Sequence, residues 1–218
     1  MLELIIQGSF MMIPLLVLSV LALAVVCDRF VAFRANKLVD VRTLRAKVLA
    51  MLRDGQEEEA LALCFNTIGP VSAVMAAGLQ SYMKHKDIAG RVDSLRAVVQ
   101  DAMEDYSHQA VLSVNTRLNV LAFVGSSAPL FGMTGTVTGM ISSFDAIASA
   151  ASMDPTLVAS GISEALITTA AGLMIAMGAV IPYHYFSTRA ESIETEIVES
   201  ASELLDYITI KHSSLKAK

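Results

Sequence analysis

The stretch Gly161-Ile-Ser-Glu-Ala-Leu-Ile-Thr-Thr-Ala-Ala-Gly-Leu173 decides the fold of this chain. Glu164 is the last charged residue before a charge-free run of about 24 residues, from Ala165 to Thr188, which is enough for a helix to cross a bilayer. Two further charge-free runs, Leu4 to Cys27 and Leu118 to Phe144, are also long enough. We therefore expect an all-α integral membrane protein with three transmembrane helices, two of which extend into a helical cytoplasmic region.

The positions of the basic residues predict the orientation. All 16 Lys and Arg residues lie in two blocks, Arg29 to Arg117 and Arg189 to Lys218, whereas the residues before the first run and the link between the second and third runs carry only acids. The positive-inside rule places both basic blocks in the cytoplasm and the N-terminus outside. The first run has no basic n-region before it, so we expect it to remain as a membrane helix and not to be cleaved as a signal peptide.

These signals divide the chain into six segments. The predicted boundaries are residues 1–33 for an external N-terminus and the first transmembrane helix, 34–117 for a cytoplasmic helical insertion, 118–147 for the second transmembrane helix, 148–160 for an external loop, 161–188 for the third transmembrane helix, and 189–218 for a cytoplasmic C-terminal helix.

Within these segments, local signals predict individual helices. Asp54-Gly55 is typical of a turn, Glu57 to Phe65 of a short helix that begins with three acids, and Gly69-Pro70 of a helix break. Pro155 is expected at the start of a helix. Apolar residues at helical spacing, with no Gly or Pro before Gly125, predict one unbroken helix from about residue 90 into the second span. The same pattern predicts that the third span continues past Arg189.

Composition excludes several functions. The net charge is −5, and no basic patch interleaved with aromatics indicates nucleic-acid binding. The four histidines (His85, His108, His184 and His212) do not have metal-ligand spacing, so we expect no metal and no cofactor. His184 is expected to cap the inner end of the third span. Cys27 and Cys64 have no paired spacing and are expected to be buried thiols in a reducing compartment.

Small residues follow one face of each of the last two spans. At helical spacing the second span carries Gly125, Pro129, Gly132, Thr136, Gly139 and Ser143, and the third carries Ala165, Thr169, Gly172, Ala176 and Ala179. One interpretation is tight helix packing, with each Thr hydroxyl bonded back to its own helix. The other is a polar girdle around a pore, because Thr136 and Thr169 are expected at similar depths, within one helical turn of each other.

The charge-free runs contain no ionisable side chain. Because an ion that crosses lipid needs an ionisable group near the middle of the membrane, a conducting chain would have to take this group from another subunit. Glu164 is expected at the mouth of the path, either to recruit cations or to cap the start of a helix at the interface.

At these residues the chain resembles the MotA/TolQ/ExbB family of ion-conducting motor subunits. The resemblance lies in Gly125-Ser-Ser-Ala-Pro129, in Gly132-Met-Thr-Gly-Thr-Val-Thr-Gly-Met140 with Phe144, and in Gly161 to Leu173, in the right spans and order. Three spans with an external N-terminus match the ExbB/TolQ branch, since MotA-type members have four spans.

The resemblance implies a homo-pentamer in the bacterial inner membrane, around two copies of a single-span partner of the ExbD/TolR type. The partner would supply a transmembrane aspartate, and ion flow past it, of protons by analogy, would drive work in the periplasm. The polar pore positions of the family fall on Thr136 and Thr169, and its acid falls on Glu164. A pore lining of small residues would comprise Gly132, Gly139, Ser143, Ala165, Gly172 and Ala176. No enzymatic activity is implied.

The chain departs from the family pattern at four positions. Gly178 stands where Pro is usual in ExbB and TolQ, and Pro182 stands where an aliphatic residue is usual, which moves any kink about one turn inward. Thr138 replaces a Trp of one well-known member, and His184 stands where Asn is common. The ion-path residues are unchanged, but the subfamily, and with it the task, stays open.

Two other functions remain to be weighed. A non-conducting membrane scaffold would need the small residues only for packing, and would tolerate Val at Thr136 and Thr169. An intramembrane serine protease would use Ser126 or Ser127 with His184, because Ser160 is expected on the opposite side of the membrane.

Overall fold

The computed structural model describes residues 10–36, 40–86, 92–149 and 155–216. These ranges are helical apart from short turns and contain no strand, which confirms the all-α prediction. The chain divides into two compact units. The membrane unit comprises Met1–Phe30 and Arg117–Phe186, and the extramembrane unit comprises Val31–Thr116 and Ser187–Lys218.

Three helices carry the predicted spans. They are α2 (Met12–Asn36), α7 (Leu118–Ser149) and α8 (Pro155–Lys216), and each contains a stretch long and apolar enough to cross a membrane. Pro155 is the first residue of α8, as the sequence predicts. The expected loop 148–160 is shorter than predicted, because α7 and α8 leave only residues 150–154 between them, and these lie outside the described residues.

The second span does not continue from the preceding helix, and this prediction was wrong. Helix α6 (Val92–Asn115) ends before α7 begins, and Arg117 between them has a φ of 70°. Asp28 of α2 holds this residue, with its Oδ1 atom 2.6 Å from the guanidinium of Arg117 and its Oδ2 atom 2.8 Å from that of Arg29. This ion pair links the break to a carboxylate far away in the sequence, and no Gly or Pro marks the break itself.

The third span does continue as predicted. Helix α8 has 62 residues, runs past Arg189 and contains Pro182 in its interior. His184 therefore lies inside a helix and not at a helix end. Its ring packs edge-on against Tyr183, with the two ring centroids 5.4 Å apart.

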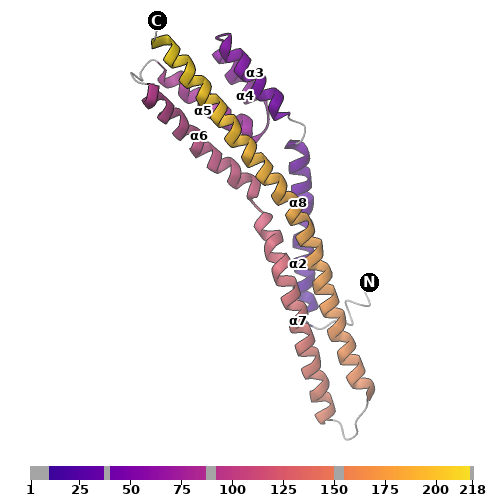
Figure 1. Ribbon diagram of the computed structural model, residues 1–218. Coiled ribbons are helices and arrows are strands. Elements are labelled where there is room, and N and C mark those ends of the chain that lie inside the picture. The colour runs from indigo at the N-terminus through magenta and orange to yellow at the C-terminus, as the bar shows by residue number, and fades with distance from the viewer. Residues whose placement is uncertain (1–9, 37–39, 87–91, 150–154, 217–218) are drawn as a thin grey trace. The chain divides into compact units, whose positions relative to one another are not determined.

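The extramembrane unit is a helical bundle (Figure 1). It contains α3 (Val41–Arg53), α4 (Glu57–Asn66), α5 (Pro70–His85), α6 and the C-terminal part of α8. Leu79 of α5, Leu95 of α6 and Leu204 of α8 are fully buried in one core. The predicted turn at Asp54-Gly55, where Gly55 has a φ of 79°, is confirmed. The predicted helix break at Gly69-Pro70 is also confirmed, since α4 ends at Asn66 and α5 begins at Pro70.

An ionic cluster joins three helices of this unit. Glu57, the first residue of α4, accepts hydrogen bonds from Lys86 at 2.7 Å and from Lys211 of α8 at 2.9 Å. Burial raises the pKa of the Glu57 carboxyl, but the hydrogen bonds and charges of the two lysines outweigh this effect and leave the pKa below its ordinary value. The predicted helix start is confirmed, and Glu57 has in addition a tertiary role that the sequence pattern does not indicate.

The two cysteines differ. Cys64 is buried, and desolvation raises the pKa of its thiol to about 11, so the thiol stays protonated at neutral pH. Cys27 is exposed, which corrects the expectation that both thiols are buried. Both cysteines are free.

Candidate functional site

Small residues hold α7 and the N-terminal part of α8 together in the membrane unit, where the two helices lie side by side (Figure 1). The facing pairs run in opposite directions along the two helices: Gly125 with Val180, Gly132 with Thr169, Gly135 with Thr168, Gly139 with Ala165, and Ser143 with Gly161. This antiparallel contact contains most of the two stripes that the sequence predicts.

The approach is closest at Gly172. A methyl group added there would lie 2.7 Å from the carbonyl oxygen of Ala128 and 3.0 Å from the Cα atom of Gly132. Because both are backbone atoms, they cannot move aside as a flexible side chain can. Only glycine at this position allows the observed separation of the helices.

The six stripe residues assigned above to a pore lining are buried within the chain. They are Gly132, Gly139, Ser143, Ala165, Gly172 and Ala176. The three residues among them that are not glycine are at most 7% exposed. The geometry of the single chain gives them a packing role between α7 and α8. A pore lining by these residues stays a proposal about the assembly.

Thr169 makes a hydrogen bond from one helix to the other. Its hydroxyl donates to the carbonyl oxygen of Gly132 on α7 at 2.9 Å. The hydroxyl therefore does not bond to a carbonyl of its own helix, as the packing interpretation of the sequence expects. The hydroxyl oxygen can still accept hydrogen bonds from a water or solvate a cation, because it has two lone pairs.

Thr136 behaves differently. Its hydroxyl donates to Met133 in its own helix at 2.6 Å, so here the packing interpretation describes the bond correctly. The side chain is half-buried. Gly132, which touches Thr169, precedes Thr136 by four residues, or about 6 Å along the axis of α7. The two threonines therefore lie at similar depth, as the sequence predicts.

Thr168 was missed by the sequence analysis. Among the described residues of the membrane unit, it is the most deeply buried polar one, with no exposed surface. Its hydroxyl donates to the carbonyl oxygen of Glu164 at 3.0 Å, and its methyl group packs against Gly135. The Gly135-x-x-x-Gly139 pattern was the signal for this contact, since it indicates close approach of another helix at Gly135.

Glu164 lies deeper in its helix than expected. Because α8 begins at Pro155, Glu164 follows nine residues after the start, or about 13 Å along the axis, and it falls inside the apolar stretch that begins at Ala159. It does not cap a helix. The carboxylate is half-buried and lies one helical turn from Thr168.

The structure does not support Ser126 as a nucleophile. The hydroxyl of Ser126 donates to Phe123 of its own helix at 3.0 Å. A nucleophile would direct this hydrogen to a base such as His184. Among the described residues, no three His, Cys, Asp or Glu side chains gather closely enough to hold a metal ion.

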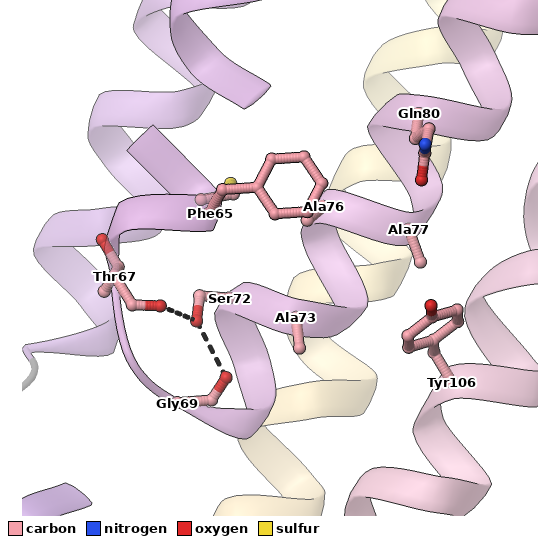
Figure 2. Close-up of a pocket in the computed structure, with 10 residues that line it drawn as sticks. Phe65, Thr67, Gly69, Ser72, Ala73, Ala76, Ala77, Gln80 and Tyr106 are labelled. Carbon is pink, nitrogen blue, oxygen red and sulfur yellow. Dashed lines mark hydrogen bonds between the residues drawn. The ribbon is translucent and has the colours of Figure 1, made fainter. Parts of the chain in front are cut away.

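The extramembrane unit also contains a cavity (Figure 2). It has a volume of about 230 Å³ and lies between the α4–α5 turn, α5 and Tyr106 of α6. Ser72 lines the cavity, and its hydroxyl lies 2.6 Å from the carbonyl oxygen of Thr67 and 2.8 Å from that of Gly69. The only thiol in the lining is the protonated one of Cys64, and no charged side chain lines the cavity.

Comparison with known proteins identifies a family whose matched region includes the α7–α8 contact. The MotA/TolQ/ExbB proton channel family matches residues 66–199, more than half of the chain and both helices of the site. The chain is 36% identical over 124 residues to the Tol-Pal system protein TolQ of Pseudomonas aeruginosa, which covers 56% of this chain and 54% of that protein. It is 26% identical over 164 residues to the biopolymer transport protein ExbB of Pseudomonas putida, a match that covers 75% of this chain and 50% of that protein.

The matches therefore span about half the length of these two relatives. Against the biopolymer transport protein ExbB of Neisseria meningitidis serogroup A, the identity is 27% over 204 residues, or 91% of this chain and 92% of that protein. Three apolar helices, the small-residue contact of α7 and α8, and these matches lead to one conclusion: this chain is a membrane protein that belongs to the MotA/TolQ/ExbB proton channel family.

Proposed function

We propose that the chain is an ion-conducting subunit of an inner-membrane motor that couples the proton-motive force to movement of a single-span partner of the ExbD/TolR type. The observation that carries this proposal is the bond from Thr169 to the Gly132 carbonyl. It places a hydroxyl with accepting capacity in a contact made mostly of small residues. Packing alone needs no such hydroxyl, because Ala or Val would fill the same space.

The proposed path uses three side chains. Glu164 collects a cation within the outer part of the span, and the hydroxyls of Thr169 and Thr136 pass it on through water or by direct solvation. The half-buried state of all three supports this role, since each keeps surface for a neighbour or a water. The aspartate that takes up and releases the proton belongs to the partner, because the apolar core of each span of this chain, apart from Glu164, has no acid.

The proposed assembly is a homo-pentamer around two copies of the partner, with the N-terminus outside and the C-terminus in the cytoplasm. Native mass spectrometry of the purified complex tests the stoichiometry, and a monomer or dimer as the only species would refute it. Cysteines placed at Ser152 and Ser213, in a chain without Cys27 and Cys64, test the orientation with an impermeant thiol reagent. We expect labelling from outside only at position 152.

A non-conducting scaffold is the second candidate. Its support is the burial of the small stripe within the chain, which explains the glycines by packing. The two functions differ in what they require of Thr136 and Thr169. A scaffold retains function when Val replaces either, whereas a conductor loses ion flow and still assembles. Proton uptake into liposomes that contain the purified complex, driven by an imposed potential, measures the difference.

A further inference from the structure

Helix α3 carries basic side chains on the face that points away from the core of the extramembrane unit. Its buried residues are Leu44, Val48 and Leu52. The exposed residues on the other side form the α3 basic face, which comprises Arg42, Ala46, Lys47, Ala50 and Arg53. Arg42 and Arg53 lie about three helical turns apart, so they share one stripe with the two alanines between them. The helix itself contains no acid, because Asp40 and Asp54 stand at its two caps.

Helix α6 carries acidic side chains on its outer face. Its buried residues include Leu95, Val99 and Met103. The exposed side opposite to them forms the α6 acidic face, which comprises Ala97, Asp101, Glu104, Asp105 and His108 at helical spacing. The single arginine of this helix, Arg96, lies outside that face, with its guanidinium 3.9 Å from Asp206 of α8.

The charges on both faces are not used within the described part of the chain. Arg45, the remaining basic residue of α3, pairs with Glu199 and Glu203 of α8 at 3.3 and 3.1 Å. Among the described residues, no ion pair includes a cation of the α3 basic face or an acid of the α6 acidic face. Glu104 accepts a hydrogen bond from Gln100 of its own helix at 2.7 Å. Both faces therefore keep their charge for a partner outside the single chain.

The two faces belong to opposite sides of the extramembrane unit. Helix α3 packs mainly on α4, α4 packs on α5, and α5 packs on α6, so α3 and α6 are the two ends of this series. Figure 1 shows them on either side of the C-terminal part of α8. One molecule therefore cannot bring its own two faces together. In two copies that stand side by side, α3 of one copy can meet α6 of the other.

From this arrangement we propose that the α3 basic face of one copy binds the α6 acidic face of the next copy. The contact joins two different surfaces, so each copy keeps one face of each kind for its other neighbour, as in a ring. The complementary charges fix the register, and the alanines at positions 46, 50 and 97 let the two helices approach. The inference rests on the proposed homo-oligomer and adds which surfaces meet outside the membrane.

Thiol cross-linking in membranes tests this contact. The chain carries Ala50→Cys and Ala97→Cys, one exposed position in each face, together with Cys27→Ser and Cys64→Ala to remove the native thiols. A membrane-permeant bis-maleimide should link neighbouring copies into dimers and larger species on a denaturing gel. Chains with only one of the two new cysteines should give no such species, because the contact joins unlike surfaces.

Charge reversal on one face should break the contact, and reversal on both should restore it. The two sets of substitutions are Arg42→Glu, Lys47→Glu and Arg53→Glu on α3, and Asp101→Lys, Glu104→Lys and Asp105→Lys on α6. Each set alone should lower the cross-linked fraction about fivefold, because like charges then face each other, and both sets together should recover about half of it. Such recovery excludes misfolding as the cause of the loss. Glu58→Lys with Glu59→Lys on α4 is the control, because both acids are exposed outside the two faces and the yield should not change.

Three results would overturn this contact alone, in a chain that native mass spectrometry shows to be oligomeric. The first is that the chain with both new cysteines forms no cross-link. The second is a wild-type yield after reversal of one face. The third is a yield in the combined variant as low as in the single reversals, which would mean that the faces bind other partners, such as anionic lipid headgroups on the α3 basic face. A chain that is only monomeric would refute the proposed assembly and this contact with it.

Discussion

Thr169 on α8 donates its hydroxyl hydrogen to the carbonyl oxygen of Gly132 on α7, 2.9 Å away. The bond needs Gly132, because a methyl group at that position would lie 3.2 Å from the Cα atom of Thr169 and would push the helices apart. Close packing and the placement of a polar group are thus one feature of the α7–α8 contact. The predictions below separate its structural part from its proposed part in conduction.

Gly172→Ala should destabilise the membrane unit. The added methyl group would lie 2.7 Å from the Ala128 carbonyl oxygen, and relief of such overpacking costs about 1–3 kcal/mol. The melting temperature of the protein in detergent should fall. Gly178→Ala is the matched control, because it adds the same group to the same helix where nothing lies within 4 Å. Equal effects of the two substitutions would contradict the assigned contact.

Thr136→Val should abolish ion-driven function while the complex still assembles, because Val keeps the shape and removes the hydroxyl. Thr134→Val provides the comparison, since the hydroxyl of Thr134 also donates to its own helix, to Leu130 at 2.8 Å, and the residue is not on the small-residue face. Loss of function in both variants, or in neither, would mean that the position of Thr136 is not special.

Much of the membrane site was predictable from sequence. The helical spacing of glycines and threonines places Gly132, Gly139 and Ala165 on facing stripes, because this pattern depends only on helix geometry. The direction of the Thr169 hydroxyl was not predictable. A Thr in a helix usually bonds to its own preceding turn, and only the absence of a side chain at Gly132 makes the longer-range acceptor available.

Two features that the sequence did not predict, the helix break at Arg117 and the ion pairs of Glu57, have a common physical explanation. Arg117, at the break, pairs with Asp28, and Glu57 pairs with Lys86 and Lys211, all far away in sequence. Periodicity and turn signals describe a residue by its neighbours along the chain. Such signals do not encode the contacts between distant segments that both features make.

Arg117→Gly and Arg117→Ala should differ in stability. A non-glycine residue in the left-handed region costs about 1–2 kcal/mol, which Gly avoids, whereas the partly exposed ion pair with Asp28 contributes at most about 1 kcal/mol. Arg117→Gly should therefore be neutral or slightly stabilising, and Arg117→Ala destabilising. Hydrogen exchange at the Val120 amide, which bonds to the Arg117 carbonyl at 3.1 Å, measures the local effect. Faster exchange in the Gly variant than in the Ala variant would refute this account.

Glu57→Gln should destabilise the extramembrane unit by roughly 1–2 kcal/mol at pH 7, because it removes the charge that Lys86 and Lys211 bind and both lysines are partly exposed. The pKa of Glu57 is lowered in the folded chain, so the folded state binds fewer protons than the unfolded state near the ordinary pKa of 4.5. The stabilisation is present above this pH and is lost as the pH falls through the folded pKa.

Limited proteolysis across pH 3–7 measures this effect. The difference between Glu57→Gln and the wild type should narrow as the pH falls below about 4.5. Glu58→Gln, an exposed position on the same turn, should match the wild type throughout. A Glu57→Gln effect that grows on acidification would show that the ion pairs are not its origin.

The hydroxyl of Thr169 is the centre of the proposed function, and Thr169→Val tests it most directly. The complex, purified with the single-span subunit that accompanies it, is reconstituted in liposomes that contain a pH-sensitive dye, and a potassium diffusion potential drives proton entry. We expect entry in the wild type and in Thr169→Ser, which keeps the hydroxyl, and at least a tenfold slower rate in Thr169→Val with the partner still bound. Proton entry at the wild-type rate in Thr169→Val would contradict the account and leave Thr169 with a purely structural bond to Gly132.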